Sequence, residues 1–192
     1  MARLTSAETL ATTRASEWTK DIAWVVGASL FVALCARLTV PLPFTPVPLT
    51  LQNFGVLLVG VVLGRRRAFA ALTLYLLEGV SGLPVFNPLG PGALAQLVGP
   101  TGGFLLAYPF VAATAGWIME SGNRTFLRGL VAATAGEIML FAGGLSWLAV
   151  LTHSLRLAIQ YGLYWFVFAE VIKVMMVAGL ASRFSKTQRV QK

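Results

Sequence analysis

Charged side chains are scarce in this chain. Asp, Glu, Lys and Arg together make up 11% of the 192 residues, whereas soluble domains carry about a quarter. Hydrophobic residues make up 57%, and the mean hydropathy is +0.76. This balance excludes an ordinary soluble domain and predicts an integral membrane protein whose length suits a single bundle.

Cysteine and histidine are nearly absent, with one residue of each, Cys35 and His153. A single cysteine excludes an internal disulfide, and a single histidine without a second histidine or cysteine does not make a metal site. The sequence also lacks an HExxH motif, a nucleophile paired with histidine and a Walker A loop. We therefore predict no catalytic residues, no metal and no ATPase within the chain itself.

The formal net charge of +8 could suggest a nucleic-acid partner, but the distribution of the charges argues against one. The basic residues lie at the ends of apolar segments and do not form a face interleaved with aromatic side chains. The positive-inside rule explains this pattern better, because cytoplasmic loops of membrane proteins collect Lys and Arg.

Six apolar segments are predicted to span the membrane, although the second and third are shorter than the roughly 20 residues of a simple span. They are 22–40, 52–63, 68–77, 103–119, 129–151 and 161–180. Twelve of the 15 Lys and Arg residues fall on the side that holds both termini, and two fall on the other side. We therefore expect an all-α protein with six transmembrane helices in one bundle and both termini cytoplasmic.

The predicted spans divide the chain into three parts. Residues 1–21 form a cytoplasmic N-terminal segment, 22–182 the transmembrane substrate-binding domain, and 183–192 a cytoplasmic tail. Four prolines within 41–48 force an extended connection after the first span. Residues 64–67 are predicted to form a tight basic turn, because three arginines at mid-membrane would be very costly.

One long connection, at 79–104, reads GVSGLPVFNPLGPGALAQLVGPTGGF. Its Gly and Pro residues prevent one continuous helix, yet it carries too many apolar side chains for a freely solvated loop. At membrane depth, irregular backbone is tolerated only where it packs in protein or lines a cavity. We expect an irregular extracellular loop that caps a substrate cavity.

Ionisable residues inside predicted spans are costly and are therefore the first candidates for a functional site. Glu170 and Lys173 lie at i, i+3 on one face of the last span. They either form an ion pair that holds the helix to its neighbours or face the cavity and offer an acceptor and a cationic donor to a ligand. Glu137 is alone in the fifth span, and both a structural and a ligand role are open for it.

Three amides flank the predicted cavity. Gln52 begins the second span, and Asn87 and Gln96 lie in the long outer loop. Amides can recognise a ligand that carries both donors and acceptors. The alternative role for each is to cap a loop, and this alternative is favoured for Gln96.

Small residues of the first span would let another helix approach closely. They are Ala23, Gly27, Ser29 and Ala33. Packing within the bundle and docking of a partner protein are both open for this face.

Several motifs occur in a fixed order between the predicted spans. They are FTPVPLTLQ at 44–52, LLVG at 57–60, GLPVF at 82–86, GPTGGF at 99–104 and EVIK at 170–173. In this order they resemble the BioY family, the biotin-binding S component of energy-coupling factor (ECF) transporters. The resemblance extends from about Trp24 to Ala181.

The resemblance implies a six-helix subunit that captures biotin from outside the cell and is not an enzyme. Biotin would be the transported substrate, and no cofactor is expected. The implied partners are a coupling protein of the EcfT type, ATPase subunits of the EcfA type and the lipid of a prokaryotic plasma (inner) membrane. The small-residue face of the first span would then dock the coupling protein.

The resemblance also implies roles at the site. Glu170 and Lys173 would bind biotin, with Gln52 and Asn87 as companions and Phe44 beside the rings. The family more usually has Asp where this chain has Glu170, and the extra methylene moves the carboxylate by about one bond length.

Two other classes of protein remain open. One is a membrane enzyme, or its accessory subunit, that acts on a small amphiphile through Glu137 and Glu170. The other is a subunit of an oligomeric pore. Saturable one-to-one binding of labelled biotin without turnover would separate the S component from both.

Overall fold

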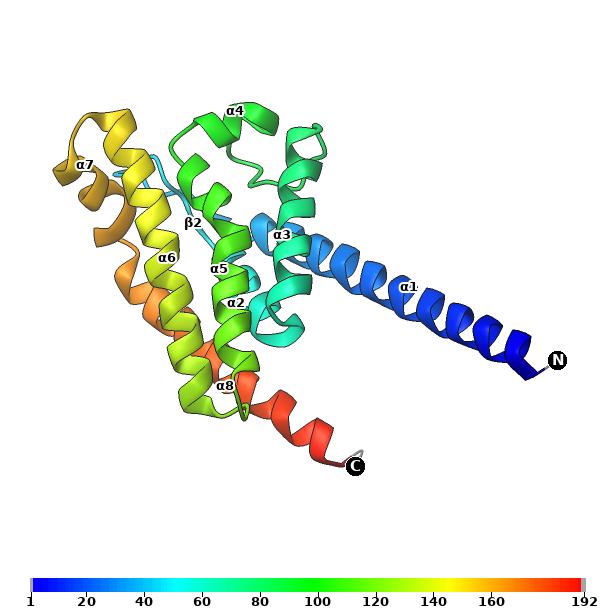
Figure 1. Cartoon of the computed structure of the whole chain (residues 1–192). Helices are drawn as coiled ribbons and strands as arrows, with labels where there is room; N and C mark the ends of the chain where they lie inside the picture. The colour runs from blue at the N-terminus through cyan, green and yellow to red at the C-terminus, as the bar shows by residue number, and fades with distance from the viewer. Residues whose placement is uncertain (1, 191–192) are drawn as a thin grey trace.

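The structure is a computed structural model that describes the backbone of residues 2–190 and the side chains of residues 17–183. Helices make up almost all of it, as Figure 1 shows. The helices are α1 (Ala2–Arg37), α2 (Gln52–Leu63), α3 (Arg65–Val80), α4 (Ala93–Val98), α5 (Gly102–Glu120), α6 (Phe126–Thr152), α7 (Leu155–Ile159), the π-helical turn η1 (Gln160–Tyr164) and α8 (Val167–Val190). The two short strands are β1 (Thr39–Val40) and β2 (Leu49–Thr50).

Among the described residues, three helices are long and apolar enough to cross a membrane, namely Glu17–Arg37 within α1, α5 and α6. A fourth candidate joins Leu155–Tyr164 to Val167–Arg183 across a bend of 49°. α2 is apolar but has only 12 residues. A mostly helical membrane protein is therefore confirmed, while six spans remain a prediction.

The two strands pair with each other at the two ends of the proline-rich connection, residues 41–48. β1 and β2 pair antiparallel, with Thr39 opposite Thr50 and Val40 opposite Leu49. α1 accordingly ends at Arg37, three residues before the predicted end of the first span. Because proline cannot continue a helix, the chain folds back on itself here and delivers Thr50 to the start of α2.

The basic turn is shorter than predicted. Gly64 alone separates α2 from α3, and the three arginines form the first turn of α3. Gly64 has φ of 79°, a left-handed conformation that glycine adopts at little cost. Arg65 pairs with Glu120 at 3.4 Å, and Arg67 pairs with Asp21 at 2.6 Å. A continuation of α2 past Leu63 would carry the arginines on with this apolar helix, and the turn at Gly64 prevents this.

The long connection at 79–104 is irregular except for its ends, which belong to α3 and α5, and for the short helix α4. Side chains from the bundle hold it in place: Trp147 donates through Nε1 to the Gly99 carbonyl at 2.9 Å, and the Tyr75 hydroxyl donates to the Val85 carbonyl at 3.0 Å. In Figure 1, α4 lies at the top of the bundle, and α8 runs toward the bottom. The connection is therefore a cap fixed over one end of the bundle.

The last predicted span is not one straight helix. α7 and η1 precede the break, and α8 begins at Val167 after a bend of 49°. A π-helical turn is a common site for such a bend. The break places Phe166 and Glu170 inside the bundle, with 5% and 7% of their surface exposed.

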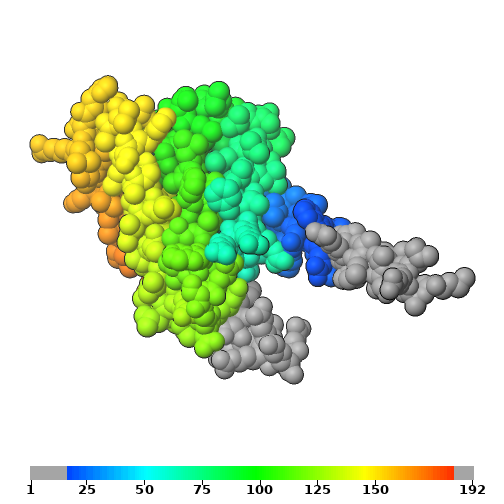
Figure 2. Space-filling view, in the orientation of Figure 1, coloured from blue at the N-terminus to red at the C-terminus, as the bar shows by residue number. Residues whose placement is uncertain are grey.

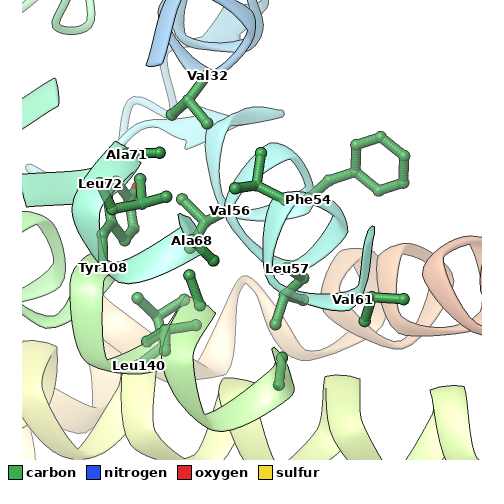
Figure 3. Close-up of a cluster of buried hydrophobic side chains, with 14 of the residues drawn as sticks. Val32, Phe54, Val56, Leu57, Val61, Ala68, Ala71, Leu72, Tyr108 and Leu140 are labelled. Atoms are coloured by element: carbon green, nitrogen blue, oxygen red, sulfur yellow. The ribbon is translucent and has the colours of Figure 1, made fainter. Parts of the chain in front are cut away.

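α5 is the central helix, because it contacts α2, α3, α4 and α6. Figure 2 shows α5 in green and α6 in yellow side by side over one face. Figure 3 shows the buried apolar residues between α2 and its neighbours, including Val56 of α2 and Ala68 of α3. Close helix contact depends on glycine here, since a Cβ on Gly60 would lie 2.4 Å from the Ala112 carbonyl oxygen.

We expect Gly60→Ala to lower the thermal midpoint of the purified protein by roughly 3–10 °C, because overpacking of a core costs about 1–3 kcal/mol. Gly179→Ala is the matched control, since a Cβ there meets no atom within 4 Å. The control gains helix propensity without a clash, so its midpoint should stay equal or rise. Equal midpoints for the two variants in a thermal unfolding assay would contradict the contact between α2 and α5.

Candidate functional site

Four polar side chains meet in the apolar interior where α2, α6 and α8 come together. They are Asn53, Glu137, Glu170 and Lys173, and each has at most 7% of its surface exposed. The predicted i, i+3 pair is formed, with Lys173 Nζ 2.8 Å from Glu170 Oε1. Buried charges are stable only when they are paired and hydrogen-bonded, and the other two residues extend the pair into a network.

Lys173 uses its full hydrogen-bonding capacity. Its ammonium donates to Glu170 Oε1 at 2.8 Å, to Asn53 Oδ1 at 2.7 Å and to the Thr50 carbonyl at 2.7 Å. An ammonium group has three N–H donors, so none is left over. Thr50 belongs to β2, so the strand pairing at the base of the proline-rich connection helps to position the lysine.

Asn53 is the centre of the network and was not predicted. Its Oδ1 accepts from Lys173, while its Nδ2 donates to Glu170 Oε2 and to Glu137 Oε1, the latter at 3.2 Å. One amide group thus accepts a hydrogen bond from the ammonium and donates to two carboxyl groups at once. The sequence does hold a signal for it, because a second amide follows Gln52 directly in an apolar helix, but the prediction did not use this signal.

Glu137 is the lone acid of its span in the sequence, but in the structure it is not isolated. Asn53 donates a hydrogen bond to it and so connects it to the ion pair. Its other carboxylate oxygen, Oε2, is buried and has no hydrogen-bond partner among the described residues. The network therefore holds two carboxyl groups and one ammonium. Neither here nor elsewhere in the described part of the chain do three His, Cys, Asp or Glu side chains gather as a metal site would require.

A cavity of about 60 Å³ lies beside this network. Phe104, Tyr108, Phe141 and Phe166 form its aromatic walls, and Lys173 and Glu170 form its polar side. A second space of about 210 Å³ lies further out, under the proline-rich connection and the long loop. Pro48, Asn87, Gln96 and Thr101 line both spaces. Ligand pockets usually measure about 300 Å³ or more, so neither space alone suffices, and a ligand of that size would need the two to join and widen.

The structure brings two of the three other predicted residues to the cavity. Gln52 lines it and donates through Nε2 to the Tyr75 hydroxyl at 2.7 Å. Asn87 lines it and also caps its loop, because its Oδ1 accepts from the Leu89 N–H at 3.0 Å. Phe44 is not among the lining residues; it is 46% exposed and stacks on Trp165 with 4.2 Å between ring centroids.

The small residues of α1 do not share one exposed face. Ser29 is fully buried and donates to Glu78 of α3, and Ala33 packs against the core. Ala23 and Gly27 are exposed and line an apolar groove of about 550 Å³ between α1 and α2. Residues two apart point to different sides of a helix, which is why Ser29 turns away from Gly27.

These features define a class: a helical membrane protein with a buried ion-pair network beside a cavity that an irregular loop helps to line. The fold is that of a solved protein, "the S-component for biotin from an ECF-type ABC transporter", with a TM-score of 0.79 and 24% sequence identity. The similarity covers 89% of this chain and 93% of that one.

Residues 5–190 match the BioY family, and the chain belongs to this family. It is 36% identical over 159 residues to Biotin transporter BioY2 of Lactococcus lactis subsp. cremoris, covering 81% of this chain and 85% of the relative. It is also 36% identical over 165 residues to Biotin transporter BioY of Thermotoga maritima, covering 85% and 96%. The resemblance found in the motifs is thereby confirmed.

Proposed function

We propose that this chain takes up biotin as the substrate-capturing S component of an ECF transporter and is not an enzyme. The observation that carries the proposal is the buried network of Lys173, Glu170 and Asn53, which lines a cavity in a member of the BioY family. Relatives that share about a third of their residues with this chain are named biotin transporters.

The chemistry of the cavity suits biotin, which combines an apolar ring and chain with a ureido group and a carboxylate. Glu170 can accept from ureido N–H groups, and Lys173 can donate to a carbonyl or carboxylate oxygen when it exchanges one of its three protein partners for the ligand. Phe104 and Phe166 offer apolar walls for the ring. The two charged residues pair with one another, so neither is buried as an unpaired charge.

The topology is part of the proposal. Six helices, including the short α2 and α3, would cross the membrane, with both termini in the cytoplasm and the capping loop outside. The distribution of Lys and Arg supports this orientation, because Arg65, Arg67 and Arg124 lie in or beside the turns that join α2 to α3 and α5 to α6. Residues 22–182 would form the substrate-binding domain in the inner membrane of a prokaryote.

Partners would supply the energy for transport. We assign this role to a coupling protein of the EcfT type and ATPase subunits of the EcfA type, with lipid around the bundle. Ala23 and Gly27 would contribute to the docking surface for the coupling protein, because they flank an exposed apolar groove with Trp24 and Leu58. Ser29 and Ala33, which pack inward, would support this surface from inside the bundle.

Titration of the purified chain with labelled biotin tests the function. We expect saturable one-to-one binding in the nanomolar range, which corresponds to about 12 kcal/mol, and no conversion of the biotin. Absence of saturable binding would overturn the proposal. Ion flux through liposomes that contain only this chain would instead indicate a pore.

A further inference from the structure

Gln96 lies in α4, within the cap over the cavity, and only 2% of its surface is exposed. Its carbonyl oxygen, Oε1, is buried and has no hydrogen-bond partner among the described residues. Buried polar atoms are nearly always paired, because an unpaired one loses its hydration without compensation. The oxygen therefore needs a donor from outside the described chain.

Capping of the loop does not account for this side chain. Asn87 shows what a cap looks like here, since its Oδ1 accepts from the Leu89 N–H at 3.0 Å. Gln96 Oε1 makes no such bond and is held in place by packing instead. A Cβ on Gly90 would lie 2.7 Å from both Cδ and Oε1 of Gln96, so the glycine leaves the space that the amide fills.

The position of the amide points to a ligand. Gln96 lines both the inner cavity and the outer space, so it lies where a substrate must pass. Three buried side-chain atoms lack a partner in the described part of the structure, on Gln96, Arg128 and Glu137, and of these residues only Gln96 lines the cavity. Lys173, by contrast, already donates to three protein acceptors.

We propose that Gln96 is a substrate-recognition residue whose Oε1 accepts a hydrogen bond from a ureido N–H of biotin. The inference rests on the proposed function. The ureido N–H groups are the only N–H donors of biotin, so an unpaired acceptor pairs with that ring and not with the carboxylate. A ligand with a similar ring and chain but no N–H would leave the oxygen unpaired, which makes Gln96 a specificity determinant.

The Gln96→Met variant of the full chain tests the proposal. Methionine matches glutamine in length but lacks the acceptor. We expect biotin affinity to fall about tenfold or more, as loss of one buried hydrogen bond predicts, while the thermal midpoint without biotin stays equal or rises. Gln160→Met, at an exposed position in η1, is the matched control and should bind as the wild type does.

Biotin methyl ester is the second ligand in this binding experiment. It keeps the ureido ring but lacks the carboxylate charge, so Gln96→Met should weaken binding of biotin and of the ester by the same factor. Gly90→Ala provides an independent variant, because its Cβ displaces the amide without changing its chemistry, and it should also weaken binding.

Two results would overturn this inference. One is unchanged biotin affinity in both Gln96→Met and Gly90→Ala, which would leave the buried oxygen to a structural water. The other is a loss that affects biotin but spares the ester, which would assign the amide to the carboxylate. If the wild-type chain itself bound no biotin, the proposed function would fail, and that outcome differs from both.

Discussion

Lys173→Met is expected to weaken biotin binding on the order of a hundredfold or more, because loss of one partner of a buried charged contact in a binding site costs about 2–5 kcal/mol and each 1.4 kcal/mol is tenfold. The substitution removes a cation that would meet the substrate. It also leaves Asn53 Oδ1 and the Thr50 carbonyl without their donor, and Glu170 without its counter-charge. A biotin titration of the purified variant measures the effect, with Lys20→Met as an exposed control.

The same variant should also be less stable without biotin, so the two effects need to be separated. The double variant Lys173→Met/Glu170→Leu removes both charges, and replacing a buried ion pair by apolar residues is often neutral for stability. We therefore expect the double variant to recover the thermal midpoint but not the affinity. Recovery of both, or wild-type affinity in Lys173→Met, would show that the pair only holds α8 to its neighbours.

The Glu170–Lys173 pair was predictable because one helix turn fixes it. Residues at i and i+3 of a helix share a face whatever the tertiary structure, and both residues stand out in an apolar span. The break at Gly64 was predictable for a similar reason, since three adjacent arginines cannot enter an apolar layer cheaply. The length of this turn was not predictable, because only the backbone of the structure shows that one glycine is enough to make it.

The rest of the polar network depends on the register between helices. Asn53 reaches Glu137 and Glu170 across 84 and 117 residues of sequence. Nothing in one sequence states which residue of α2 will oppose which residue of α6 or α8. The pattern at the start of α2 offered two adjacent amides, and the structure brings both Gln52 and Asn53 to the cavity.

Phe44 illustrates a second limit. Its place depends on how the proline-rich connection packs on the bent segment before α8, where Thr45 donates through Oγ1 to the Tyr161 carbonyl at 2.6 Å and Phe44 stacks on Trp165. A π-helical turn and a 49° bend leave no clear periodic signal in an apolar run. The motif around Phe44 therefore supported the family, but the sequence alone could not show that this ring packs on Trp165 and not on the cavity.

Asn53→Leu should be the most damaging change of an uncharged residue in the site. The leucine removes the acceptor for Lys173 and the donor that lies between the Glu137 and Glu170 carboxyl groups. Two carboxylates that share a site without a donor between them repel each other. We expect the free energy of unfolding to fall by about 3 kcal/mol and biotin affinity to fall about tenfold or more. Asn123→Leu, in the exposed turn before α6, is the control.

Glu137→Gln tests this explanation in the same background. If repulsion between the carboxyl groups causes the damage, neutralising Glu137 should recover part of the stability lost in Asn53→Leu, whereas in the wild type it should gain little or cost some. Thermal or denaturant unfolding of the four proteins gives the coupling energy between the two positions, and contacting residues typically couple by about 0.5–3 kcal/mol. Strictly additive effects would show that Asn53 acts through Lys173 alone. A clear coupling would instead show that Glu137 is part of the network through its hydrogen bond with Asn53.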